Sequence, residues 1–536
     1  MPIALPLSAR PLIVFCALYL LAGLVGHDPW KVDDAVHLGV AYEFAKEGDW
    51  LNPRIANDAW LGMPPLFHWL AALLGKGLSS LLAFHNAARL ATALCGALLF
   101  YGLSRTAQRL HGPTAALGAP LLAMGTVGLL VPIHEAQPLI ALLAAQSFLH
   151  LGLARLIAGS RKDLLLGSLI ASLSIALGLL SVGALAIIPL AVLPLLALLH
   201  PAWRGKNTAA VLLALLFGLG LASLWPLTLA NTTPELLPTF WKIELAKLTP
   251  PTWSADTLQN HMELLGWAPW PLLPIALWAL WAYRRQLTTP AFFLPLVGTL
   301  LAFVQIFLLA EPRPLNHLLL IVPLVLLASA GVEKLRRGAA NAFDWFGMMT
   351  FTLLAGLVWL GGWSMMTGEP ARVAKNFTKS EPGFVGELSL PALIAALLLS
   401  GIWLWSLFRL PKSPWRSATH WAAGLTLMWG LLAALWMPWM DYGKTYRPVA
   451  LSLRKALAGN DECVTARNLG DAQKASLRYF MDLAPRAYST KHQECDLLLI
   501  QGSPRSENTQ PGWRKVWEGN RVGDKGEKLR LYRRND

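Results

Sequence analysis

Charged residues are scarce in this sequence. They make up 14% of its 536 residues, whereas soluble domains carry roughly 25%. A soluble protein of this length would need a charged surface, so the shortage argues against an ordinary soluble fold. Hydrophobic residues make up 55% of the chain, and its mean hydropathy is +0.47. We therefore predict an integral membrane protein.

Cysteine is scarce as well, with four residues in the chain. Cys16 and Cys95 lie in apolar blocks and are expected to be inert packing residues. Cys463 and Cys495 lie in the polar C-terminal tail. A disulfide between them would fit an exported domain, and two free thiols are the alternative. A Gly-rich phosphate loop is also missing from the sequence, which disfavours a nucleotide donor.

Long blocks almost free of charge predict the membrane spans, because about 20 apolar residues cross the hydrocarbon core. Residues 64–85 are apolar but contain Lys76, and we expect them to form a helix at the membrane surface. A span there would place every later basic cluster on the opposite side. About 13 spans are predicted, near residues 11–27, 88–108, 114–132, 138–155, 163–180, 184–200, 208–226, 264–282, 291–310, 315–332, 345–363, 388–408 and 418–438.

The net charge of +14 reflects Lys and Arg in the short connections between spans, such as Arg155, Arg161 and Lys162. Short loops rich in Lys and Arg favour the cytoplasmic side, so these residues indicate topology, and we expect no nucleic-acid partner. The same rule places three long external segments on the outer side, together with the tail: 28–87, 227–263, 364–387 and 440–536.

The tail differs in composition from the rest of the chain. It contains 18 Lys or Arg and 12 Asp or Glu, with short apolar runs between turn residues. Its periodicity predicts helices over 446–458 and 471–483, and strands over 462–465, 495–501 and 528–532. We therefore divide the chain into a membrane domain, 1–439, and a small soluble α/β domain, 440–536.

The most informative motif follows the first span, within residues 27–37. Asp33 and Asp34 are adjacent carboxylates that precede a predicted helix, so an N-cap is the simpler interpretation of Asp33. A Gly48-Asp49-Trp50 turn and then Pro64-Pro65-Leu66 follow, ahead of an apolar helix. That order of features is much rarer than an acidic pair after a loop.

On these residues the chain resembles the GT-C glycosyltransferases, in particular the branch of the aminoarabinose lipid A transferase and the protein O-mannosyltransferases. Residues 225–226, 240–244, 267–270 and 314–317 extend the resemblance. It implies an all-α polytopic membrane bundle of GT-C type with a periplasmic C-terminal domain. It also implies inverting transfer of a hexosyl or pentosyl group from a polyprenyl-phosphate donor. The acceptor would be lipid A, an envelope glycan or a protein, at the periplasmic face of a bacterial inner membrane.

The resemblance also suggests the site residues. Asp33 matches the family's catalytic aspartate, and Asp34 matches the acid that follows it. A carboxylate at this place can orient an acceptor hydroxyl and take its proton. The leaving phosphate needs cations. Glu135 is the candidate for a further catalytic acid, and the candidates for binding phosphate or substrate are Lys31, Arg54, Lys247, Arg313, His134 and His317.

A divalent metal held by Asp33, His134 and Glu135 is one hypothesis, and a hydrogen-bonded polar pair of the latter two is the other. The family's Lys-Pro-Pro-Leu reads Met63-Pro64-Pro65-Leu66 here, and its later Lys-Gly pair reads Val182-Gly183. Two further functions therefore stay open, namely a lipid or sugar transporter or flippase, and a catalytically impaired scaffold with the same fold. Transporters place ionisable residues inside the membrane, whereas the acids here gather outside, which favours an enzyme.

Overall fold

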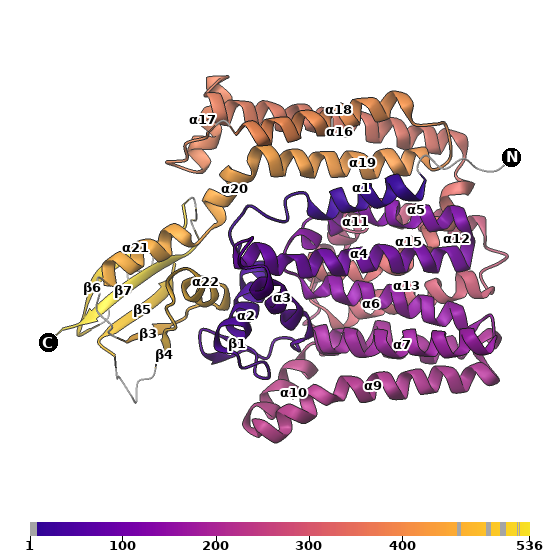
Figure 1. Ribbon diagram of the computed structural model, residues 1–536, viewed down its shortest axis with the longest axis horizontal. Helices are drawn as coiled ribbons and strands as arrows, with labels where there is room; N and C mark the ends of the chain where they lie inside the picture. The colour runs from indigo at the N-terminus through magenta and orange to yellow at the C-terminus, as the bar shows by residue number, and fades with distance from the viewer. Residues whose placement is uncertain are drawn as a thin grey trace.

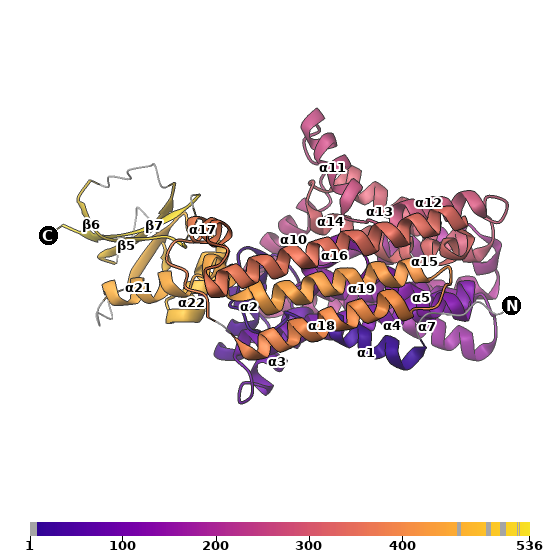
Figure 2. The ribbon, with the colours of Figure 1, turned by 90° about the horizontal axis from the view of Figure 1, so that it is seen from above.

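The computed structural model describes residues 8–387, 389–457, 463–488, 495–503, 511–522, 524 and 526–535. A long helical bundle forms most of the molecule, and a small domain built on a β-sheet lies at one end of it (Figure 1). Most of the bundle helices run side by side along its length in both views (Figures 1 and 2). Buried leucine and alanine side chains join them into one extended hydrophobic core.

Nine stretches among the described residues are long and apolar enough to cross a membrane, or up to eleven if each of two bent helix pairs counts as one span. The chain is therefore a multi-pass membrane protein. The helices of the bundle are α1 (Ala9–Leu21), α4 (Phe84–His111), α5 (Pro113–Met124), α6 (Pro138–Leu156), α7 (Arg161–Val182), α8 (Leu193–Ala197), α9 (Lys206–Thr232), α11 (Ala255–Trp267), α12 (Leu272–Ala282), α13 (Pro290–Leu309), α14 (Pro314–His317), α15 (Ile321–Gly331), α16 (Arg337–Thr367), α18 (Leu390–Arg409), α19 (Arg416–Leu431) and α20 (Met437–Lys444).

The stretch that begins with α7 contains a chain reversal. α7 ends at Val182, and the next residue, Gly183, has a φ of +68° in the left-handed region that favours glycine. The next segment packs back on α7, since a Cβ built on Gly178 would lie 2.1 Å from Cδ1 of Leu190. The Lys206 ammonium then donates to the Gly159 carbonyl at 3.0 Å. The chain has thus returned to the end at which α7 began, as two consecutive spans require. The described residues thus contain up to eleven spans when each bent pair is counted as one. The reversal after α7 and the shorter apolar helix α1 each add one more, which gives the predicted number of about 13 crossings.

The two ends of the bundle differ in charge. At one end, the basic connections contact one another: Asp163 accepts from Arg109 at 3.1 Å and from Arg155 at 2.9 Å. The other end lies next to the small domain (Figure 1). α3 is not among the candidate spans, in agreement with a helix at the surface. The elements gathered at this second end are α2 (Asp33–Glu47), β1 (Arg54–Ile55), β2 (Asp58–Ala59), α3 (Leu66–Gly77), α10 (Leu237–Ala246) and α17 (Ala371–Ser380).

The small domain contains a five-stranded mixed sheet of order β4–β3–β5–β7–β6. β3 pairs in parallel with β4 and β5, whereas β7 is antiparallel to β5 and β6. The elements are α21 (Arg447–Leu457), β3 (Val464–Arg467), α22 (Asp471–Met481), β4 (Arg486–Ala487), β5 (Leu497–Gly502), β6 (Trp513–Gly519) and β7 (Lys528–Arg534).

The predicted architecture, an all-α polytopic bundle with a small α/β domain, is confirmed. Both helices and three strands of the small domain lie where the periodicity predicts them. β4 and β6 are not among the predicted strands, because β4 has two residues and β6 is a largely exposed edge strand without apolar alternation. Cys463 and Cys495, which precede the neighbouring strands β3 and β5, form a disulfide with their Cα atoms 5.2 Å apart.

Candidate active site

Asp34 is the buried member of the acidic pair. Its side chain is 1% exposed, and its two oxygens accept from the Arg89 guanidinium of α4, at 3.1 and 2.7 Å. The backbone N–H groups of Trp30 and Ala136 also donate to it, at 3.1 and 2.8 Å. Burial alone would raise the pKa of Asp34, but the charge and hydrogen bonds of Arg89 lower it to about 2. The carboxylate is fully engaged within the protein. This arrangement favours a positioning role for Asp34, and its catalytic role stays a prediction.

Asp33 and Glu135 lie on either side of this anchor. Asp33 precedes Asp34 and Glu135 precedes Ala136, and Asp34 and Ala136 are joined by a 2.8 Å hydrogen bond. Both side chains are partly exposed. Within the described part of the chain, neither carboxylate has a hydrogen-bonding or ion-pair partner. The carboxylates of Asp33 and Glu135 are therefore held near each other, and both are available to bind a substrate.

The surroundings of these carboxylates shift their protonation. Burial raises the pKa of Asp33, and the charge of Arg313 opposes that shift. Burial, followed by the negative charge of Asp34, raises the pKa of Glu135 to about 8, against the charges of Lys444 and Arg89. Glu135 is thus largely protonated at neutral pH and can donate a hydrogen bond. Two carboxyl groups with different environments are typical of acid–base sites.

Lys444, at the end of α20, contributes a cation to the same region. Its ammonium lies 4.2 Å from the centroid of the Trp30 ring. Burial lowers the pKa of Lys444, and the charge of Glu135 opposes that shift. Asp441, one helical turn earlier, accepts from the Trp30 indole N–H at 2.8 Å and from the Asp28 backbone N–H at 2.9 Å. The last helix of the bundle thus fixes the loop that leads into α2 and its first residue, Asp33.

The small domain also holds this loop and α2. Arg447 donates to the Asp28 carboxylate through Nε at 2.8 Å. α22 packs on α2 so closely that a Cβ built on Gly39 would lie 2.4 Å from the Cβ of Ala475. Arg478 of α22 also binds the buried Glu43 carboxylate of α2 at 2.8 Å. The small domain is therefore part of the support of the site.

The predicted phosphate-binding cations do not converge on one point among the described residues. Lys31, Arg54 and Lys247 each neutralise a carboxylate of their own, because the fold places an acid beside each of them. Arg313 is exposed and also pairs with Glu311, yet its charge acts on Asp33. The three acid partners are Glu527 at 2.8 Å from Lys31, Asp49 at 3.2 Å from Arg54 and Glu244 at 2.6 Å from Lys247.

The metal hypothesis fails on His134. Its Nδ1 lies 2.5 Å from the Leu130 carbonyl oxygen and its Nε2 lies 2.6 Å from the Tyr19 carbonyl oxygen. Both ring nitrogens face the backbone, so His134 is unsuited to bind metal or phosphate. Over the described ranges, no group of three or more His, Cys, Asp or Glu side chains is arranged to hold a metal ion. His317 is buried, and its Nδ1 lies 3.1 Å from the Arg313 carbonyl oxygen.

An apolar groove of about 330 Å³ opens on the bundle surface between α7, α9 and α10. Pro64, Trp225 and Phe240 line it, and the buried Glu244 carboxylate lies at its wall. The groove is connected to α2 through α3: Pro64 precedes α3, and His68 of α3 lies 3.1 Å from His37, between Nε2 and Nδ1. His37 is one helical turn from Asp33.

No protein-family model matches the sequence, and no curated protein matches it. The fold does match solved structures. ArnT from Cupriavidus metallidurans bound to undecaprenyl phosphate aligns over 97% of each chain, with a TM-score of 0.69 at 16% identity. The apo form of that ArnT aligns over the same shares with a TM-score of 0.69 at 15% identity.

The chain has the GT-C fold of ArnT. The arabinosyltransferase EmbB from Mycobacterium smegmatis overlaps less closely, with a TM-score of 0.46 at 17% identity, over 85% of this chain and 43% of EmbB. At this identity the match to ArnT establishes the architecture alone, and the chemistry depends on the residues of this chain.

The sequence analysis did not identify three residues that form part of the candidate site, namely Arg89, Asp441 and Lys444. Arg89 is a lone charge near the start of an apolar block, which is itself a signal of function or pairing in a membrane protein. Asp441 and Lys444 directly follow the last predicted span. Their partners are far away in the sequence, for example 411 residues between Trp30 and Asp441, so only the fold reveals the contacts.

Proposed function

We propose that this chain is an inverting glycosyltransferase that moves a hexosyl or pentosyl group from a polyprenyl-phosphate donor to an acceptor hydroxyl at the membrane surface. Asp33 supports this proposal most directly, because its carboxylate has no protein partner among the described residues. The hydrogen bond from the Ala136 backbone N–H to Asp34 keeps the segment that carries Glu135 next to it. The ArnT structure of the same fold was solved with undecaprenyl phosphate, which supports the donor class.

The proposed reaction is a single displacement. The acceptor oxygen forms a bond to the anomeric carbon while the bond from that carbon to the phosphate oxygen breaks. Asp33 takes the acceptor proton, and the electron pair of the broken bond leaves with the polyprenyl phosphate. Arg313 and Lys444 offset the charge that develops on the phosphate. Glu135, protonated at neutral pH, donates a hydrogen bond to the donor. One displacement inverts the anomeric configuration.

The groove between α7, α9 and α10 is the proposed path of the donor's lipid tail. Its lining is apolar, and it opens on the surface of the bundle. Two family lysines are replaced here by Met63 and Val182. The Lys247 ammonium lies 3.3 Å from the Val182 carbonyl oxygen, so a cation approaches the place of the second missing lysine from α10. On this ground we propose Lys247 as a further contact of the donor phosphate, which would compete with Glu244 for its ammonium.

We further propose that the site faces the periplasm of a bacterial inner membrane. The basic connections gather at the bundle end away from Asp33, and such residues favour the cytoplasm. The acceptor would then be lipid A, an envelope glycan or an exported protein. Membrane lipids surround the bundle in every case.

The test is transfer from labelled undecaprenyl-phosphate sugars by the purified full chain, with release of undecaprenyl phosphate as the readout. Asp33→Asn should lower the rate by about 10²–10⁴-fold, the usual contribution of a general base. Asp58→Asn is the matched control, because Asp58 belongs to the same external segment but pairs with Lys474 at 2.6 Å. Unchanged transfer in Asp33→Asn contradicts the catalytic assignment. Movement of labelled lipid across vesicles without transfer supports a flippase instead.

A further inference from the structure

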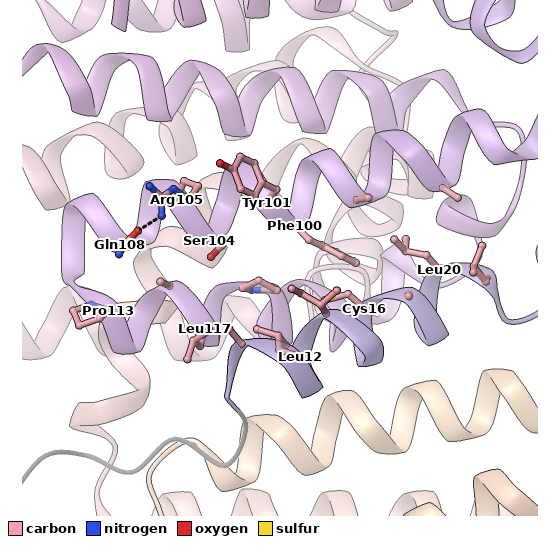
Figure 3. A pocket seen from close by; sticks show the side chains of 18 residues that line it. Leu12, Cys16, Leu20, Phe100, Tyr101, Ser104, Arg105, Gln108, Pro113 and Leu117 are labelled. Atoms are coloured by element: carbon pink, nitrogen blue, oxygen red, sulfur yellow. Dashed lines mark hydrogen bonds between the residues drawn. The ribbon is translucent and has the colours of Figure 1, made fainter. Parts of the chain in front are cut away.

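A second groove runs along α4 from Ala93 toward Arg105, away from Arg89 and the candidate active site. It has a volume of about 720 Å³ and lies between α1, α4 and α5 (Figure 3). Its walls are almost entirely apolar. The polar residues Arg105 and Gln108 lie at one end and Leu20 lies toward the other, as Figure 3 shows. The lining residues used below are Leu12, Cys16, Ala93, Ala97, Tyr101 and Arg105.

The length of this groove suits one lipid chain. It follows α4 from Ala93 to Arg105, which is about 18 Å at the rise of an α-helix. One leaflet of the hydrocarbon core is about 15 Å thick. An acyl chain that enters at Arg105 would therefore occupy the groove along its length. The side chains of Leu12 and Cys16 from α1 form the facing wall.

A polar pocket of about 480 Å³ adjoins the groove at the Arg105 end. The pocket and the groove share Tyr101, Arg105 and Gln108, and the pocket also contains Arg109 and Arg155. The single carboxylate of Asp163 binds both of the latter arginines. Arg105 binds the Gln108 side chain at 2.7 Å and has no carboxylate partner in the described part of the chain. The pocket thus keeps an uncompensated positive charge at the mouth of an apolar groove.

We propose that this groove and pocket together bind one anionic glycerophospholipid from the leaflet at the basic end of the bundle. Its phosphate binds Arg105 in the pocket, and one acyl chain fills the groove. The site is separate from the proposed donor site. Arg105 and the buried Arg89 behind Asp34 are 16 residues apart on one helix, which corresponds to about 24 Å. A lipid in this groove would contact both α1 and α4 and stabilise their packing. α4 also contains Arg89, which binds Asp34 in the candidate active site.

The test uses native mass spectrometry of the purified full chain with equal amounts of phosphatidylglycerol and phosphatidylcholine of the same acyl chains. Preferential retention of phosphatidylglycerol is expected. Arg105→Gln should weaken that retention about fivefold, since one basic residue near an anionic leaflet contributes about 1 kcal/mol. Arg337→Gln is the matched control, because it removes the same charge from the basic end outside both cavities.

A second variant tests the groove itself. Ala97→Phe fills it and should abolish retention, whereas Leu353→Phe on the exposed face of α16 should leave retention unchanged. Equal retention of both phospholipids, equal effects of Arg105→Gln and Arg337→Gln, or full retention by Ala97→Phe would each overturn the proposal. Replacement of bound phosphatidylglycerol by an equal amount of undecaprenyl phosphate would also overturn it, since the occupant would then be the carrier lipid.

Discussion

Asp33 and Asp34 are adjacent in the sequence, but the same substitution should change the stability of the protein at Asp34 and not at Asp33. Asp34→Asn leaves the Arg89 guanidinium, which is 0% exposed, without its counter-ion. Removal of one partner from a buried ion pair costs about 3–5 kcal/mol of unfolding free energy. Asp33→Asn removes a carboxylate without a protein partner among the described residues, so its stability change should stay within about 0.5 kcal/mol.

The assay pairs thermal unfolding in detergent, followed by tryptophan fluorescence, with the transfer rate of the same preparation. Asp33→Asn should keep the unfolding midpoint and lose transfer. Asp34→Asn should lower the midpoint and lose transfer with it. Asp58→Asn breaks a more exposed ion pair, which contributes about 0–1 kcal/mol, and it sets the scale for a surface effect.

The double variant Asp34→Asn with Arg89→Gln distinguishes loss of the ion pair from a general disruption of core packing. Because the two side chains bind each other, their effects should be less than additive. A midpoint for Asp34→Asn equal to that of Asp58→Asn would refute the anchoring role. A stable Asp34→Asn protein without transfer would show that Asp34 acts on the substrate after all.

The pH dependence of stability provides an independent check on the same pair. The Asp34 pKa of about 2 in the folded chain lies below its ordinary value of 3.8. The ionised form is therefore favoured by folding. Its contribution, on the order of 2 kcal/mol, is fully present above pH 3.8 and is lost as the pH falls through about 2. Asp34→Asn should remove this acid-dependent term.

Three further outcomes are expected. Gly39→Leu should detach the small domain, because even a Cβ there would lie 2.4 Å from an α22 side chain; new protease cleavage of the tail is the measurement, and an uncleaved tail contradicts the packing. Replacement of Cys463 and Cys495 by serine should cost about 3–4 kcal/mol in denaturant unfolding of the tail, from loop entropy over their 32-residue separation; a loss below about 1 kcal/mol would contradict this. Transfer should decline as the pH rises through about 8, where Glu135 ionises; Glu135→Gln, which stays neutral, should keep its rate there, and an unchanged alkaline decline would exclude Glu135 as its cause.

The membrane spans could be predicted from the sequence, because the hydrophobicity of a segment depends only on the residues within it. Even the short span that returns after α7 was predicted, because the residues before His200 form an apolar block. The strands β4 and β6 were not open to prediction in the same way. Each is ordered by hydrogen bonds to a neighbouring strand, and neither contains the alternation of buried and exposed residues that marks a strand locally.

The candidate site shows the same division. The acid pair and its following motifs direct attention to Asp33 because their order along the chain is itself distinctive. The cations were harder to assign, because charge in a sequence does not reveal its partner. Lys31 and Arg54 are near Asp33 in the sequence, yet each is neutralised by an acid of its own.

The sequence by itself determined that the chain crosses the membrane many times, that its basic loops share one side, and that Asp33 and Asp34 follow the first span. Composition and order along the chain are sufficient for these conclusions. Only the tertiary structure decided which acid is free. Asp34 is bound by Arg89, 55 residues away, and Asp33 is not bound within the described residues. Two neighbouring carboxylates differ because α2 turns one toward the core and the other toward the surface, and that orientation depends on packing between helices that are distant in the sequence.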